Sequence, residues 1–117
     1  MKAKLFIAAI AVSFSAPSMA ESMDDVVARA NSMSSQLCES LGSLAQTSLE
    51  KMSVNPQGVY EILMSDGDSG ISWYDPAYFG MASELNTTTM QPKEFGLHWQ
   101  IQCMKGAKEW INSMVSQ

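Results

Sequence analysis

The chain has 117 residues, with twelve acidic and seven basic side chains and a formal net charge of −5 at pH 7. Nucleic acids and anionic lipid surfaces are bound by clustered Lys and Arg, which this chain lacks, so neither is an expected partner. A length in this range predicts a single domain with one core.

Residues 1–20 predict a secretory signal peptide. Lys2 and Lys4 precede an apolar stretch at residues 5–14, and the small side chains of Ser18 and Ala20 suit signal peptidase. The apolar stretch is only about half as long as the roughly twenty residues of a membrane-spanning helix, so we expect cleavage. This predicts a periplasmic or secreted bacterial protein, a single helical domain at residues 21–117, and no membrane insertion after cleavage.

The cysteines, Cys38 and Cys103, predict one disulfide. Exported proteins reside in oxidising compartments, where a lone pair of cysteines most often bonds, and only one intramolecular pairing exists here. Neither cysteine belongs to a CxxC motif or has further metal ligands nearby, as a redox or metal role would require. In the chain-entropy model, closing so long a loop stabilises a fold by about 4 kcal/mol.

A long amphipathic helix is predicted over residues 23–52. Ser22 and Asp25 resemble a capping box at its start. Cys38 lies on the flank of its apolar face, and Gly42 is expected to weaken its middle. The apolar side chains recur at spacings of three and four, with Ser48 filling one slot of the stripe, at Val26, Ala30, Met33, Leu37, Leu41, Leu44 and Met52.

Two shorter helices and a loop follow. Asn55 and Pro56 supply an N-cap and a first-position proline for a helix over residues 56–64. Asp75 and Pro76 repeat this device for a helix that reaches residue 85. Between them, residues 65–70 contain two glycines and two aspartates, a composition that predicts a loop.

Two periodicities compete in the last segment. Residues 95–103 alternate between apolar and polar, which indicates a strand, and a hairpin at residues 59–74 could pair with it. A helical stripe explains more of the segment, at Phe95, Trp99, Cys103, Ala107, Trp110 and Met114. We therefore predict an all-α fold, a small bundle of about four helices with one disulfide. The alternative is an α+β fold with a hairpin at 59–74 and a strand at 95–103.

Several local motifs resemble a group of uncharacterised small exported single-disulfide helical proteins of bacteria and phage. They are Leu37-Cys38-Glu39 with Leu44-Ala45, Gly58-Val59, Asp75-Pro76-Ala77-Tyr78, and Glu94-Phe95 followed by Trp99 and Cys103. The resemblance implies an all-helical fold and no activity. In size, acidity and single disulfide, the chain is also similar to the periplasmic acid-stress chaperones, whose cysteines lie closer together.

No motif indicates an enzyme, a cofactor or a metal. The single histidine, His98, has no nucleophile motif beside it, and no phosphate-binding or dinucleotide-binding glycine pattern occurs. The segment from Asp66 to Gly70 invites a calcium-loop interpretation, but Ile71 falls where the turn glycine should stand and Ala77 where the closing carboxylate should stand. We expect no catalytic residue, no cofactor and no metal site.

The candidate binding surface consists of four aromatic side chains within seven residues, Trp73, Tyr74, Tyr78 and Phe79. Tryptophan and tyrosine dominate binding hot spots because they bury a large rigid surface at little entropic cost. The alternative is that these rings close the core of the bundle.

The functional hypothesis is an exported, non-enzymatic protein-binding module whose partner is a protein. One class is a chaperone-like or stress-related binder, loosened when its carboxylates lose charge in acid. The alternative is an immunity protein or inhibitor that blocks an exported toxin or hydrolase with an acidic, aromatic-bearing face.

Overall fold

The structure, a computed structural model, describes residues 22–67 and 69–116, and within these ranges it contains four α-helices and no strand. They are α2 (Met23–Met52), α3 (Pro56–Ser65), α4 (Asp75–Glu84) and α5 (Pro92–Val115). The predicted all-α bundle is confirmed. The α+β alternative is wrong, because α5 covers the whole of residues 95–103, α3 covers residues 59–65, and no described residue of 66–74 is in a strand. The predicted signal peptide at 1–20 lies outside the described residues.

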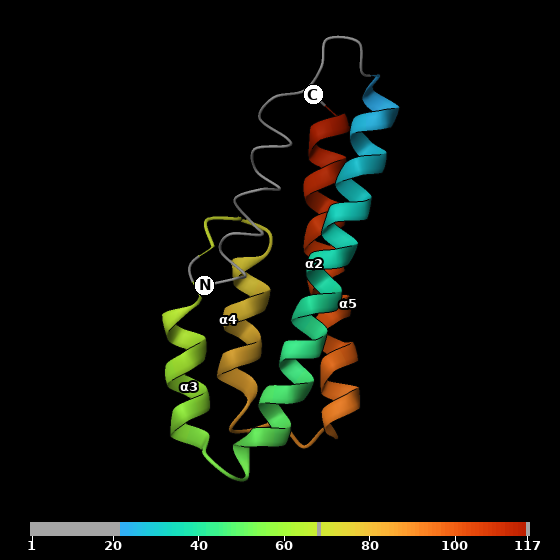
Figure 1. Ribbon diagram of the computed structural model, residues 1–117. Coiled ribbons are helices and arrows are strands. Elements are labelled where there is room, and N and C mark those ends of the chain that lie inside the picture. The colour runs from blue at the N-terminus through green and yellow to red at the C-terminus, as the bar shows by residue number, and fades with distance from the viewer. Residues whose placement is uncertain (1–21, 68, 117) are drawn as a thin grey trace.

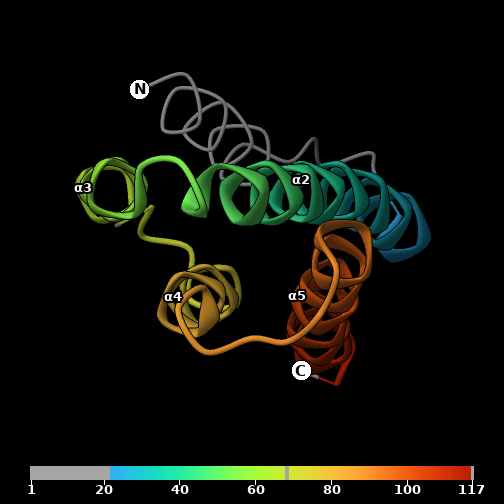
Figure 2. The ribbon, with the colours of Figure 1, turned by 90° about the horizontal axis from the view of Figure 1, so that it is seen from below.

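The two long helices form the axis of the molecule. Figure 1 shows α2 and α5 running antiparallel side by side, while α3 and α4 lie beside the half where α2 ends and α5 begins. Viewed along the bundle, α2 and α3 form one layer and α4 and α5 the other (Figure 2). The result is an elongated bundle with extents of 52 × 24 × 18 Å.

The predicted helix starts of α2 and α3 are confirmed. The Oγ of Ser22 accepts a hydrogen bond from the backbone N–H of Asp25 at 3.2 Å, as an N-cap does. The side chain of Asn55 accepts one from the N–H of Gly58 at 3.1 Å, and Pro56 takes the first helical position, where no N–H is needed.

The start of α4 differs from the prediction. Asp75 is its first residue and does not cap it; the N-cap is Tyr74, which makes no side-chain capping bond. The carboxylate of Asp75 instead accepts hydrogen bonds from the N–H and Oγ of Ser69 and from the N–H of Gly70. It therefore holds the glycine-rich loop, where the chain has a positive φ of 83° at Gly70.

The face of α2 that meets α5 is made of small residues. Ala30, Ser34, Cys38 and Gly42 recur every fourth residue, and all four are buried. At Gly42 the helices touch backbone to backbone: a Cβ there would lie 2.9 Å from the carbonyl oxygen of Gly96, and a Cβ on Gly96 would lie 2.6 Å from that of Gly42. The expectation that Gly42 weakens α2 missed this role, since the glycine allows the close helix contact.

The disulfide between Cys38 and Cys103 is formed, as predicted. It joins α2 to α5, with a Cα–Cα distance of 5.4 Å, and both cysteines are fully buried. One helical turn from Cys38 is the Gly42 contact, so a covalent bond and a backbone contact hold the same stretch of the helix pair.

The larger core side chains fill the space between this pair and the short helices. They include Leu37 and Leu41 of α2, Leu63 of α3, Met81 of α4 and Phe95 of α5. The predicted stripe of α5 is buried at Phe95, Trp99, Cys103 and Ala107, whereas near its end Ile111 is buried and Trp110 and Met114 are half-buried. Burial of this apolar surface is the main stabilising contribution.

We predict that Gly96→Ala destabilises the fold. The added methyl group would meet the backbone of α2, which cannot rotate away, so the helices must separate. Overpacking of this kind costs about 1–3 kcal/mol, more than the gain in helix propensity. Chemical denaturation should show the loss, and Ser43→Ala, at an exposed position beside Gly42, is the control. An unchanged midpoint for Gly96→Ala would contradict the backbone contact.

Reduction of the disulfide should also destabilise the fold. The loop closed by Cys38 and Cys103 spans 65 residues, for which the chain-entropy estimate is about 4 kcal/mol. Denaturation with and without a thiol reductant measures the difference, and Cys38→Ser/Cys103→Ser should match the reduced protein. Equal stability of the oxidised and reduced forms would refute a stabilising role.

Candidate functional site

The structure divides the predicted aromatic surface between the core and two separate surface positions, one on α4 and one in the turn before it. Tyr74 and Tyr78 are only 6% and 5% exposed and belong to the core, which is the alternative left open by the sequence. Phe79 is 39% exposed and Trp73 is half-buried. The four rings therefore do not form one continuous binding surface.

The two buried tyrosines have structural roles. The hydroxyl group of Tyr78 donates a hydrogen bond to the carbonyl oxygen of Leu63 at 2.8 Å, which ties α4 to the end of α3. Burial, with a smaller contribution from the carboxylate of Asp75, raises the pKa of Tyr74 to about 12. Burial likewise raises the pKa of Tyr78 to about 12, with smaller contributions from Asp66 and Tyr74.

Phe79 and Trp73 contact different neighbours. Phe79 packs edge-on against Tyr78 and covers Gly67, where a Cβ would lie only 2.7 Å from its ring. Trp73 faces α5 and stacks with Trp110, with ring centroids 5.7 Å apart and an interplanar angle of 29°. Of these two rings, Trp73 is therefore the one that forms a site with α5.

Trp73 and Trp110 lie in a groove between the start of α4 and α5, which we call the tryptophan groove. It is lined by Ser72, Trp73, Pro76, Ala77, Trp99, Gln102, Gly106, Glu109, Trp110 and Ser113. Gly106 makes the groove possible, because a Cβ there would lie 2.9 Å from the carbonyl oxygen of Trp73. Trp73 can therefore approach α5 closely enough to stack on Trp110.

Trp99 lies in the inner wall of the tryptophan groove. Its ring packs so closely on Gly80 of α4 that a Cβ there would lie 2.7 Å from Cη2. Its indole Nε1 is buried and has no hydrogen-bond partner among the described residues. An unpaired buried donor costs free energy. The indole of Trp99 is therefore held in this wall by its packing on Gly80 and not by a hydrogen bond within the described residues.

The chemistry of the tryptophan groove favours binding. Of the described residues that line it, only Glu109 carries an ionisable side chain, and it is exposed. The groove thus presents the partly exposed indole rings of Trp73 and Trp110, with one carboxylate at the edge, an arrangement that accepts apolar and cationic groups.

Sequence reasoning identified Trp73 but missed Trp110, Gly106 and Glu109 as its neighbours. Trp110 continues the helical stripe of Phe95 and Trp99, and that pattern predicts a core position for it. The available signal was Gly106, a glycine inside a helical pattern, which often marks a close approach of another segment.

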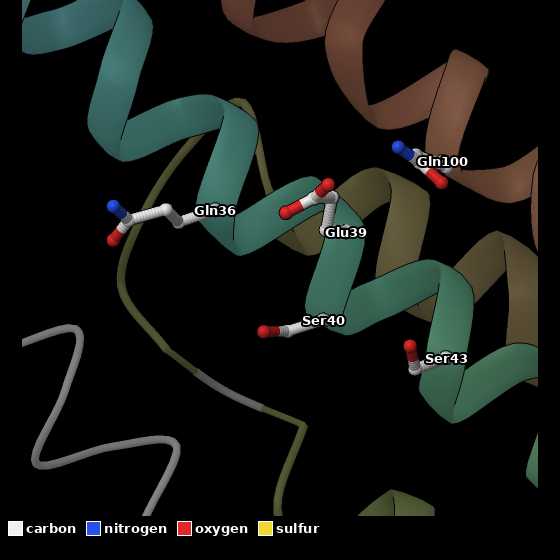
Figure 3. A pocket seen from close by; sticks show the side chains of 5 residues that line it. All are labelled: Gln36, Glu39, Ser40, Ser43 and Gln100. Carbon is white, nitrogen blue, oxygen red and sulfur yellow. The ribbon is translucent and has the colours of Figure 1, made fainter.

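A second hollow lies over α2, on the side shown in Figure 3. Gln36, Glu39, Ser40 and Ser43 line it from the exposed surface of α2, and Gln100 reaches it from α5. All five side chains are polar, and the four on α2 are exposed to solvent. This hollow is a solvated surface and contributes no convergent set of groups for catalysis.

His98 and the glycine-rich loop complete the sequence-based candidates. His98 is half-buried on α5, with its ring edge-on to Trp99 at a centroid distance of 5.1 Å. In residues 22–67 and 69–116, no group of three or more His, Cys, Asp or Glu side chains could hold a metal ion. Both oxygens of Asp75 already accept hydrogen bonds from the loop.

Comparison of the chain with protein-family models, curated proteins and solved structures finds no significant match. The resemblance to small exported helical proteins therefore stays a prediction. None of the described helices combines the length and the apolar composition that crossing a bilayer requires.

We predict that stability falls as pH rises from about 10 to 12. The pKa values of Tyr74 and Tyr78 are raised above their unfolded value of 10.0, so the folded state keeps protons that the unfolded state releases. Within this window, ionisation of each tyrosine lowers the folding equilibrium constant by up to about tenfold per pH unit. Below about pH 10 the stabilisation by the protonated tyrosines is fully present. Denaturation at several pH values, with tyrosinate absorbance followed in parallel, measures the effect.

The control is Tyr78→Phe. It should lose about 1 kcal/mol at neutral pH, because the carbonyl of Leu63 loses its donor, and its stability should fall less steeply above pH 10. Ionisation of Tyr74 and Tyr78 near pH 10 in the intact fold would contradict the interpretation.

Proposed function

We propose that this chain is an exported, non-enzymatic protein-binding module that holds one basic partner protein in the tryptophan groove. The observation that carries the proposal is the pair of indole rings of Trp73, in the turn before α4, and Trp110, in α5, which stack on each other and are both partly accessible. Export is supported by the signal-like start of the chain and by the disulfide, which is typical of oxidising compartments.

Binding by indole rings has a clear physical basis. A tryptophan buries a large rigid surface on binding and loses little conformational entropy, which is why tryptophans dominate interface hot spots. Trp73 and Trp110 are held by their own contact and by the close approach at Gly106. The groove is therefore preformed, so binding requires little further ordering.

Charge selects the kind of partner. The chain carries a net charge of −5, and Glu109 places a carboxylate at the edge of the groove. An acidic protein attracts basic partners during diffusion, and a Lys or Arg beside Glu109 can also contact an indole face. The bound segment would place an apolar side chain against the rings and a basic one at Glu109, as an inhibitor or immunity protein requires of its target.

The chaperone-like class is the weaker candidate. It requires acid to loosen the fold, whereas every described Asp and Glu side chain is exposed or half-buried, so acid breaks no buried ion pair among them. The disulfide and the Gly42 contact also oppose separation of α2 from α5. A preformed groove is better suited to one dedicated partner than to many unfolded clients.

The test is capture of a partner from periplasmic extract by the immobilised protein and two matched variants. Trp73→Ala should weaken binding by about tenfold or more, as hot-spot truncations do. Phe79→Ala removes an exposed ring of α4 that is not part of the tryptophan groove and should bind like wild type. Association should slow as salt is raised, because the attraction is screened.

Equal loss of binding in both variants would place the partner elsewhere than in the tryptophan groove. Capture of many weakly held proteins, more at acidic pH than at neutral pH, would support the chaperone-like class instead.

A further inference from the structure

A strip of side chains on α5 is left largely exposed by the fold, with only Met104 half-buried. It consists of Glu94, Leu97, Ile101, Met104 and Lys108, at spacings of three and four, and we call it the α5 strip. Leu97 is 58% exposed and Ile101 is 47% exposed, although α5 packs along much of α2. This is the heptad spacing with which a helix meets another helix along a seam.

The α5 strip is distinct from the other two faces of this helix. Gly96, Cys103 and Ala107 face inward and are buried, and two of them contact α2 directly. The tryptophan groove uses Gln102 and Gly106. At about 100° per residue, Ile101 lies more than a quarter turn from the buried residues and from Gln102 and Gly106, whereas Glu109 stands at the edge of the groove that is nearer to the strip. The strip can therefore be covered while the indole rings stay accessible.

A hollow beside the strip could accept side chains of another helix. Asn31 and Ser34 of α2 line one side of this hollow, and Ile101, Met104 and Ile111 of α5 line the other. An apolar side chain from a second helix lying along the strip can enter between α2 and α5, as knobs enter holes in helix packing.

The charges at the ends of the strip identify the occupant. Glu94 stands seven residues before Ile101 and Lys108 seven residues after it, on the same face because seven residues are nearly two turns. The strip is therefore acidic at one end, apolar in the middle and basic at the other. A helix of the same sequence laid antiparallel matches it at every position, whereas a parallel copy would bring like charges together.

We propose that the α5 strip is a homodimer interface, in which two copies of the chain pair antiparallel about a twofold axis beside Ile101. Ile101 then meets its own copy, Leu97 packs on Met104 and the aliphatic stem of Lys105, and Glu94 pairs with Lys108 in both directions. Such an interface is isologous and closed, so the assembly stops at two copies. One helix face is a small contact area, so the dimer should dissociate in the micromolar range.

Pairing through the α5 strip leaves the tryptophan groove of each copy accessible. A dimer would present two grooves, and a partner with two binding segments, or two partners side by side, would be held more tightly than by one copy. The dimer does not depend on the proposed function, because its interface contains no residue of the groove.

Sedimentation velocity over about a hundredfold range of protein concentration tests the dimer. Wild type should shift from monomer to dimer as concentration rises. Glu94→Lys and Lys108→Glu should each weaken association by about tenfold, because each places like charges opposite one another. The double variant Glu94→Lys/Lys108→Glu should restore association to within about threefold of wild type, because the pairs are re-formed with exchanged signs.

Two further variants isolate the apolar contact. Ile101→Ser, at the axis, should abolish the dimer, whereas Phe79→Ser alters an exposed apolar side chain away from the strip and should leave it intact. The substituted positions Glu94, Ile101, Lys108 and Phe79 are exposed, so a cooperative thermal transition should confirm that each of these variants folds. Trp73→Ala should dimerise normally, which separates this test from that of the groove.

A wild-type protein that stays monomeric at every concentration would overturn the proposal, and the strip would then belong to a different protein. A dimer that the double charge exchange fails to restore would overturn the antiparallel arrangement.

Discussion

The backbone contact between Gly42 and Gly96 is the constraint on which the rest of the structure depends. It brings α2 and α5 close enough for the Cys38–Cys103 bond to form one turn away. Small residues along α2 leave no room for large side chains between the two helices, so the leucines must point toward α3 and α4. The close contact between α2 and α5 thus directs the large apolar side chains of α2 into the core shared with α3 and α4.

The same constraint positions the surfaces available for binding. Because α2 occupies one face of α5, the remaining faces of α5 carry both the tryptophan groove and the α5 strip. The groove is built from α4 and α5, whereas the strip belongs to α5 and borders α2. A rigid pair of helices can therefore support two separate contacts without any change in the core.

Features that depend on local sequence were predictable. Ser22, Asn55 and the prolines mark helix starts through their own backbone chemistry, and the two cysteines allowed a single pairing. The Trp73–Trp110 stack was not predictable, because it joins residues far apart in the sequence and depends on how α4 and α5 are rotated. A single-helix stripe defines the buried face of that helix but not which neighbour it meets. For the same reason the sequence could not show that Tyr74 and Tyr78 enter the core while Trp73 and Phe79 stay partly exposed.

The hydrogen bonds from the Ser69–Gly70 loop to the carboxylate of Asp75 have an evolutionary consequence. Because the carboxylate accepts hydrogen bonds from both Ser69 and Gly70, it fixes the length of the six-residue turn from Ser69 to Tyr74. This turn holds Trp73 against α5. An inserted or deleted residue within that turn would break these hydrogen bonds and move the indole of Trp73 away from the groove. Relatives that keep this mode of binding should therefore vary in loop length before Ser69 and not after it.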